Sequence, residues 1–415
     1  MSKTRFAFRK IGFILLCLLL LVSQACAESG TDVFRTADRV YDYQNGWVLF
    51  INDHSFGFVN PLGEILTGGW DNASNFNPET GVAIVYKGKV GRFHSPEGNG
   101  AGFYGLINTR GEEVLPVEYR SISSTDEGIV PLVTADGDFC IYHLDTGEFF
   151  RPEDPAITYM GGRCSNGLIA VYTGGLNENG SPVNADPDGK WGYIDKEGKT
   201  VIPFRFDLAS QVFVDGLAMV KTEGHYGAID SSGNFAIPPT WDKLNLNEGA
   251  IIGTKDDASY ILDKTGTIRN TLPAGDYQYD GNGFFIVFNL TEPNSTSLID
   301  ADGNEIIPAE WGTIARANDH LAVVSKKDGK KSKSGVLDYR KGKLVLPLIY
   351  DTIEPMSGQA VRYFCQLGYY GFMDEEFNTI ISPSFLEVTS MSDGYAAVRT
   401  EDGWHMIDLT GTILF

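Results

Sequence analysis

Cysteine is scarce in this chain of 415 residues, which contains only five. None of them forms a C-x-x-C pair, so thiol-redox and zinc-ribbon sites are excluded, and their irregular spacing excludes a disulfide framework. Cys140 and Cys164 leave two interpretations open. They form either a single disulfide bridge or two buried thiols that behave as small apolar side chains.

Basic residues are also few, because 33 Lys and Arg stand against 54 Asp and Glu, which gives a net charge of −21. This balance argues against nucleic acid and anionic lipid as partners, since their phosphates require Lys and Arg for neutralisation. The acidic surface suits either the solubility of an exported protein or the binding of cations or a basic partner.

Long apolar runs are absent after the N-terminus, so the sequence predicts no membrane span. Residues 11–22 are apolar but too short to cross a bilayer. They follow four basic residues and precede Ala25-Cys26-Ala27, which fits a signal-peptidase site. We predict a signal peptide at 1–27 and a single secreted or cell-surface domain at 28–415, whose net charge falls to −25 because the four basic residues are lost. The alternative is a lipoprotein anchored at Cys26.

Extended amphipathic helix patterns are missing as well, whereas 48 Gly, 19 Tyr and 25 Phe accompany short alternating apolar runs typical of strands. Internal repetition explains this pattern. The clearest copies are KWGYIDKEGKTVIPFRFD at 190–207 and HYGAIDSSGNFAIPPTWD at 225–242. We identify about ten copies of a unit of about 35 residues, with cores near 56–71, 104–120, 140–150, 191–207, 226–242, 259–272, 297–311, 334–351, 370–385 and 404–415.

Each position of the repeated motif has a physical role. The aromatic-Gly pair begins a strand, and its glycine allows another strand to pack closely. In I-D-x-x-G, the Asp carboxylate accepts hydrogen bonds from the turn backbone, and the Gly adopts the positive φ of a tight hairpin. The following Pro is expected to end the returning strand. We assign the turn role to Asp195 with Gly198, Asp230 with Gly233, and Asp300 with Gly303.

One unit therefore makes three or four short antiparallel strands, which cannot bury an apolar face alone and must stack into an all-β array. The motif resembles the WG-repeat family of bacterial exported proteins, and the resemblance covers about residues 40–415. Two copies depart from it, with His405 at the motif glycine and Phe377 at the turn glycine. The resemblance implies no catalytic residue.

The chain ends favour a closed, β-propeller-like ring of these repeats. The last unit stops midway at Gly411–Phe415, and Arg39–Asp42 resembles the piece that should follow. If the two ends together complete one unit, the ring has no exposed sheet edge. The alternative is an open, curved β-solenoid, because ten units exceed the usual four to eight propeller blades.

Candidate catalytic chemistry is sparse. The repeated aspartates are explained as turn formers, and the six histidines lack metal-ligand spacing. No nucleophile-elbow or phosphate-loop motif is present. Five of the six tryptophans occupy repeat positions, which favours core packing over sugar stacking. We therefore favour a non-enzymatic scaffold that binds an extracellular protein or glycan, and the alternative is a propeller-type hydrolase or lyase with a funnel active site.

An insertion at 174–190 contains one candidate metal site. Asn184, Asp186 and Asp188 alternate along the chain before a glycine, which resembles the start of a calcium loop. Asp195 falls at position 12 counted from Asn184, where such loops place a closing carboxylate, although its turn role already explains it. The competing interpretation is a solvated acidic turn. No other cofactor is predicted.

The signal-peptide assignment predicts the first residue of the exported protein. N-terminal sequencing of material secreted by the source cell should begin at Glu28, because cleavage follows Ala27. A diacylglycerol-modified Cys26 at the N-terminus would instead establish the lipoprotein.

Overall fold

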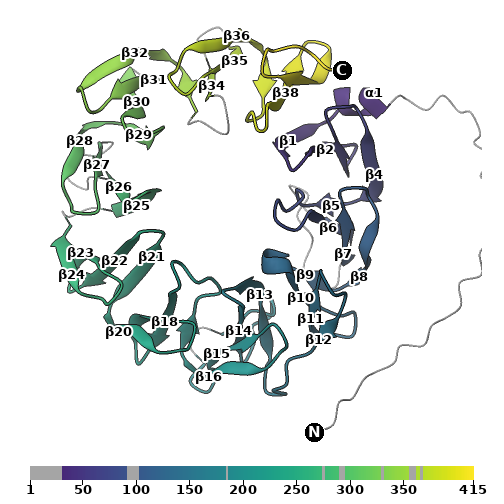
Figure 1. Cartoon of the computed structure of the whole chain (residues 1–415), viewed down its shortest axis with the longest axis vertical. Coiled ribbons are helices and arrows are strands. Elements are labelled where there is room, and N and C mark those ends of the chain that lie inside the picture. The colour runs from purple at the N-terminus through teal and green to yellow at the C-terminus, as the bar shows by residue number, and fades with distance from the viewer. Residues whose placement is uncertain are drawn as a thin grey trace, which may run out of the picture.

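The computed structural model describes residues 30–90, 102–183, 186–272, 276–288, 295–328, 331–354, 361–364 and 368–415. Short antiparallel sheets follow one another around a ring (Figure 1). The first five consist of β1 (Arg39–Gln44), β2 (Trp47–Asn52), β3 (Ser55–Val59) and β4 (Ile65–Trp70); β5 (Asn72–Ala73), β6 (Val82–Gly88), β7 (Gly102–Asn108) and β8 (Glu113–Tyr119); β9 (Ser121–Ile122), β10 (Ile129–Val133), β11 (Phe139–His143) and β12 (Phe149–Phe150); β13 (Tyr159–Ser165), β14 (Leu168–Tyr172), β15 (Trp191–Asp195) and β16 (Thr200–Phe206); and β17 (Leu208–Ala209), β18 (Ala218–Thr222), β19 (His225–Ile229) and β20 (Phe235–Trp241).

The remaining sheets continue the same pattern to the C-terminus. They consist of β21 (Lys243–Asn247), β22 (Ala250–Lys255), β23 (Ala258–Leu262) and β24 (Ile268–Thr271); β25 (Asp276–Gly281), β26 (Phe284–Phe288), β27 (Thr296–Ile299) and β28 (Glu305–Trp311); β29 (Thr313–Arg316), β30 (Leu321–Asp328), β31 (Lys331–Asp338) and β32 (Lys343–Tyr350); β33 (Thr352–Ile353), β34 (Val361–Phe364), β35 (Tyr370–Met373) and β36 (Thr379–Phe385); and β37 (Glu387–Val388), β38 (Tyr395–Thr400) and β39 (Gly403–Asp408).

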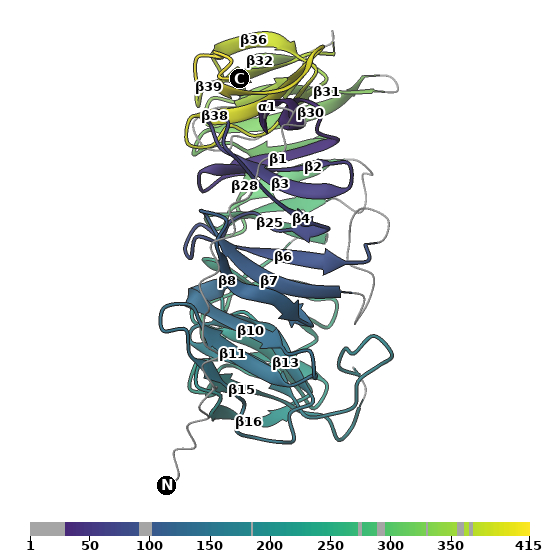
Figure 2. The same ribbon diagram turned by 90° about the vertical axis from the view of Figure 1, so that its right-hand side faces the viewer.

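Within each sheet the strands pair in chain order, from an inner strand to an outer one (Figure 1). Successive sheets follow one another around the ring, as Figure 2 shows for β1–β4 and the strands beneath them. The described residues otherwise contain one short α-helix, α1 (Gly30–Arg35), and a 3₁₀ turn at Asp126–Gly128. None of the described helices has the length and apolarity required to cross a membrane. The all-β, propeller-like prediction is confirmed.

The motif glycine occupies the position where the third and fourth strands of a sheet come closest. A Cβ added at Gly192 would lie 2.6 Å from the carbonyl oxygen of Ile202, and one at Gly227 would lie 2.6 Å from that of Ile237. Real Cβ atoms do not approach a backbone oxygen this closely, so a larger residue at Gly192 or Gly227 would force the outer strand to shift. The same contact recurs at Gly105, Gly335 and Gly371.

The predicted role of the motif proline is wrong. Strand β16 continues through Pro203 to Phe206 rather than ending there. The register shifts beside it, because Trp191 pairs with Phe206 but Tyr193 pairs with Ile202. Pro203 thus lies in a bulge, where its missing N–H group removes no regular ladder hydrogen bond.

The turn glycines pack one sheet against the next. A Cβ added at Gly233 would lie 3.0 Å from Cγ2 of Ile202, on the outer strand of the preceding sheet. A Cβ added at Gly266 would lie 2.9 Å from Cγ2 of Ile237, again on the outer strand of the preceding sheet. Ile202 and Ile237 are fully buried. The turns at Gly233 and Gly266 therefore cover the isoleucine that precedes the motif proline in the preceding sheet.

The two chain ends meet and close the ring, so the open-solenoid alternative is wrong. The rings of Phe34 and Phe415 lie 5.9 Å apart, and those of Tyr43 and Tyr395 lie 5.5 Å apart. The backbone N–H of Ser390 donates to Asp42 Oδ1 at 2.8 Å. Each end nevertheless keeps to its own sheet, because β1 pairs with β2 and the described part of the last sheet comprises β37 to β39. Closure is by side-by-side packing.

The two departures from the motif fit their surroundings. His405 replaces the motif glycine in the last sheet, where a single bridge between Ile407 and Ile413 stands in for the fourth strand. Its ring nitrogens lie 3.1 Å from the Phe415 oxygen and 3.2 Å from Asp402 Oδ1. Phe377 adopts the positive φ of the turn glycine that it replaces, at +63°, and buries its side chain.

The turn at Gly198 predicts a difference between two glycine substitutions. Gly198 has φ +86° and its added Cβ would lie 2.2 Å from the carbonyl oxygen of Arg151. Gly216 has φ +80° and no atom near the added Cβ. Gly216→Ala should cost about 1–2 kcal/mol of unfolding free energy from left-handed strain, and Gly198→Ala should cost roughly 1–3 kcal/mol more because of overpacking. Chemical denaturation measures both, and equal losses would show that the neighbouring backbone yields without cost.

Candidate functional site

The repeated aspartates hold hairpin turns. Asp195 Oδ1 accepts the backbone N–H groups of Glu197 and Lys199, both at 2.9 Å. Asp230 and Asp300 each accept the N–H groups two and four residues on, at 2.8–2.9 Å. The paired glycines Gly198, Gly233 and Gly303 have φ of +86°, +83° and +79°, the left-handed conformation that such a turn needs. The same two acceptor bonds recur at Asn60, Asn108, Asp263, Asp374 and Asp408.

In Asp230 and Asp263 these hydrogen bonds stabilise the ionised carboxylate. Donation by the N–H of Asn234, together with the Asn234 side chain and the N–H of Ser232, lowers the pKa of Asp230. In Asp263 the Thr265 hydroxyl, followed by backbone N–H groups, lowers the pKa. A carboxylate whose pKa is lowered in this way is a poor general acid or base at neutral pH. The carboxylates of Asp230 and Asp263 are thus held in their turns as hydrogen-bond acceptors.

The tryptophans belong largely to the core. Trp70, Trp191, Trp241, Trp311 and Trp404 are all buried, so their faces are not presented to a ligand. Trp47, which lies outside the repeat consensus, is half-buried and its ring centre lies 6.2 Å from that of Phe76. Sugar stacking on these indole rings is therefore not supported by their positions.

The cysteines do not form a nucleophilic or bridged site in the described residues. Cys140 and Cys164 are both free and buried, and they belong to different core clusters. Burial, followed by the charge of Glu127, raises the pKa of the Cys164 thiol to about 12. A thiol with so high a pKa is not reactive at neutral pH. The interpretation of both as small apolar core residues agrees with this arrangement.

The insertion between β14 and β15 places two of the three candidate calcium ligands in one turn. Asp186 Oδ2 accepts the N–H of Gly175 at 2.6 Å, and its Oδ1 accepts that of Asp188 at 3.0 Å. These bonds, that to Gly175 first, lower the pKa of Asp186. Asn184 lies outside the described residues. Across those that are described, no three His, Cys, Asp or Glu side chains converge as metal ligands, and the calcium site stays a prediction.

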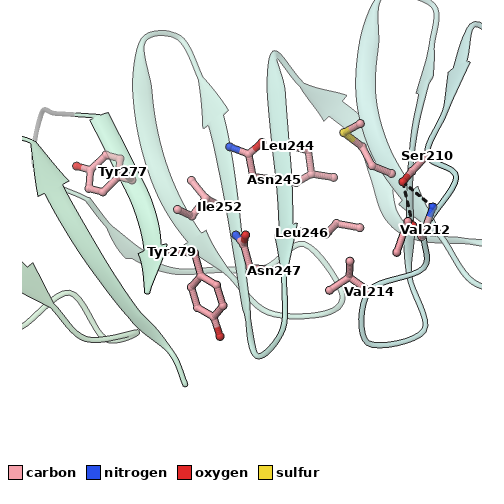
Figure 3. A pocket seen from close by; sticks show the side chains of 11 residues that line it. Ser210, Val212, Val214, Leu244, Asn245, Leu246, Asn247, Ile252, Tyr277 and Tyr279 are labelled. Atoms are coloured by element: carbon pink, nitrogen blue, oxygen red, sulfur yellow. Dashed lines mark hydrogen bonds between the residues drawn. The ribbon is translucent and has the colours of Figure 1, made fainter. Parts of the chain in front are cut away.

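A cavity of about 370 Å³ opens on the inner side of the ring, across β21 and towards β25 (Figure 3). Ligand pockets typically occupy about 300–1,000 Å³, so the space suits a small ligand or one segment of a longer one. Its walls come from three successive sheets. It is lined by Ser210, Val212, Val214, Met219, Leu244, Asn245, Leu246, Asn247, Ile252, Tyr277 and Tyr279.

The lining of this cavity is neutral. Its polar groups are the hydroxyls of Ser210, Tyr277 and Tyr279 and the amides of two asparagines. Burial raises the pKa of Tyr277 to about 12, so its phenol stays protonated at physiological pH, and its hydroxyl has no hydrogen-bond partner among the described residues. The arrangement offers hydrogen bonds and ring surface to a ligand, without an acid and base pair.

Two other hollows are less suited to a ligand. One of about 670 Å³ lies between outer strands β28 and β32 and is mainly apolar, with Trp311 and Leu344 in its wall. Another of about 500 Å³ beside the insertion holds charged groups that already have partners. There, Lys190 Nζ lies 2.6 Å from Asp207 Oδ1, and Lys221 lies over the Tyr226 ring.

The inner cavity is the candidate site that sequence reasoning missed. Its signals are visible in the chain, as KLNLN at 243–247 and YQY at 277–279, two alternating strands with one side chemically distinct. Alternation alone does not reveal which neighbouring sheet each face meets. The ring supplies that information.

The family model of the WG containing repeat matches residues 104–132, 191–224, 226–255 and 370–404. The chain contains WG repeats. Each matched WG repeat begins in the third strand of one sheet and ends near the second strand of the next. The sequence unit is therefore offset by half a sheet from the structural one.

The chain is distantly similar to several solved structures. A eukaryotic initiation factor is 12% identical over 75% of this chain and 87% of that chain, with a TM-score of 0.46. The tricorn protease is 12% identical over 91% and 44%, with a TM-score of 0.23. Hsv2p of Kluyveromyces lactis is 11% identical over 66% and 96%, with a TM-score of 0.33. No curated protein matches the chain.

The lowered pKa of Asp230 predicts how its turn responds to pH. A carboxylate whose pKa falls below 3.8 on folding adds stability that is present above the unfolded pKa and is lost as pH falls through the folded pKa. Asp230→Ala should lower the melting temperature at pH 7 by roughly 2–4 °C. It should also reduce the loss of stability that the parent protein shows as pH falls. Asp230→Asn is the matched control, because Asn60 and Asn108 make the same two acceptor bonds. If both variants have the same melting temperature at pH 7, the hydrogen bonds that the side chain at position 230 accepts contribute nothing to stability.

The calcium hypothesis is tested by titration calorimetry. Binding by Asn184, Asp186 and Asp188 should release or absorb heat in the millimolar range and raise the melting temperature. The Asp186→Ala, Asp188→Ala double variant should lose both effects. An identical response in the double variant, or none in the parent, would leave only an acidic turn.

Proposed function

We propose that this protein is a non-enzymatic scaffold, secreted or displayed at the cell surface, that binds an extracellular protein or glycan partner on its ring of WG repeats. The observation that carries the proposal is the inner cavity, whose neutral hydroxyl and amide lining suits recognition. The arrangement of repeated sheets adds support, because stacked repeats present an extended surface for a partner.

The enzyme alternative calls for an acid, a base and a nucleophile that converge on one cavity. The inner cavity offers neutral groups instead, and in the charged hollow beside the insertion Lys190 is already paired with Asp207. These features favour a scaffold over a hydrolase or lyase. The export proposal follows from the basic and apolar leader at 1–27, which lies outside the described residues.

The proposal is tested with the mature chain, residues 28–415, immobilised and exposed to separate protein and polysaccharide fractions of the cell surface. A saturable component should be retained at a fixed ratio to the ring and released unchanged by free mature chain. The Gly198→Ala variant, which perturbs a turn outside the cavity lining, serves as a control for general sheet integrity. Release of cleaved products that increase with time would overturn the proposal in favour of an enzyme.

A further inference from the structure

We propose that the inner cavity, at the face shared by β21 and β25, binds a neutral saccharide chain. This inference rests on the proposed scaffold function and assigns its ligand class to one site. Figure 3 shows Asn245 and Asn247 on the side of β21 that faces Tyr277 and Tyr279. Leu244 and Leu246 lie on the opposite side, toward Val212 and Val214.

The strand pattern explains this two-sided arrangement. Successive side chains of a strand point to opposite faces, so residues two apart share one face. Leu244 belongs to the core cluster shared with the preceding sheet, together with Leu217 and Trp241. The two asparagines are consequently directed toward the following sheet. Tyr277 and Tyr279 pack from that sheet against Ile252 and its neighbours.

The two asparagine amides are available for a ligand. Neither Asn245 nor Asn247 makes a side-chain hydrogen bond within the described part of the chain, and Asn245 is exposed. Each amide offers both a donor and an acceptor, as does each sugar hydroxyl, so one amide pairs with adjacent hydroxyls of a single ring. The spacing of two residues along a strand, about 7 Å, sets the two amides on successive parts of an extended chain.

The remaining walls of the cavity match the apolar C–H faces of a sugar ring. A pyranose has C–H faces as well as hydroxyl edges, and these faces pack on aromatic rings or aliphatic side chains. Tyr279 is fixed for this role, because its hydroxyl donates to the carbonyl oxygen of Glu248 and accepts from the N–H of Gly283 at 3.2 Å. Val214 and Leu246 supply an aliphatic surface at the other end.

Charge excludes other ligand classes. No Asp, Glu, Lys, Arg or His contributes to the cavity wall. Nearby, Asp280 is engaged with Arg316, whose Nε lies 2.9 Å from Asp280 Oδ2, and both side chains are largely buried. An acidic saccharide or a charged peptide would lose hydration here without gaining a counter-charge. An uncharged saccharide needs no counter-charge to bind.

Calorimetry with three probes tests the inference on the mature chain: hexasaccharides of β-1,4-linked glucose, mannose and N-acetylglucosamine. At least one should bind, and polygalacturonate, the charged control, should bind at least tenfold more weakly. The Asn245→Leu, Asn247→Leu double variant should weaken binding at least tenfold while the melting temperature stays within a few degrees. If the double variant does not fold, Asn245→Ala replaces it, because this side chain is exposed. Asn245→Ala should also weaken saccharide binding.

Gln278→Leu is the matched control, because Gln278 lies between Tyr277 and Tyr279 on β25 and points to the opposite face. It should leave saccharide binding unchanged. Absence of binding for all three hexasaccharides, or equal binding by parent and asparagine variants, overturns the inference. If the hexasaccharides do not bind but the ring still retains a cell-surface partner, the scaffold proposal stands. If neither the hexasaccharides nor a cell-surface partner binds, the saccharide inference and the scaffold proposal are both overturned. Binding of an uncharged peptide that survives both asparagine variants identifies strand addition along β21 instead.

Discussion

The close approach of a glycine to a carbonyl oxygen on the adjacent outer strand organises five of the described sheets, at Gly105, Gly192, Gly227, Gly335 and Gly371. At Gly192 and Gly227 a methyl group would lie 2.6 Å from that oxygen. With no side chain in the way, the outer strand pairs with a shifted register at this point, and Ile202 and Ile237 are fully buried. That isoleucine then forms the surface on which the hairpin turn of the next sheet rests. The same isoleucine thus takes part in strand pairing within its own sheet and in packing against the next sheet.

Much of this architecture follows from the sequence, because its determinants are local. The Asp and Gly of each turn lie three residues apart and interact with backbone groups of the same hairpin, so their roles are readable from one copy of the motif. The motif glycine was also readable, since aromatic-Gly at the start of a strand indicates a close neighbour. Pro203 was not, because whether a proline ends a strand or lies in a bulge depends on the partner register.

The candidate site is harder to predict for a physical reason. Asn245 and Tyr279 are 34 positions apart and belong to different sheets, and their juxtaposition depends on the angle at which successive sheets meet. The alternation of Leu and Asn along β21 indicates two faces of unlike chemistry, but both faces of an inner strand in a ring have a neighbour. Tryptophan gives no guide to the site, because the repeat places five of the six tryptophans in the core, as their positions in the motif predict.

The offset between the WG repeat and the sheet has a further consequence for how such rings vary. Since a repeat supplies the outer half of one sheet and the inner half of the next, gain or loss of one repeat leaves every remaining sheet whole. The junction between the first and last sheets, where Tyr43 of β1 packs on Tyr395 of β38, needs no strand exchanged across it. The ring consequently has no obligatory first sheet, and joining its ends while opening it at another junction gives a circular permutant with the same contacts.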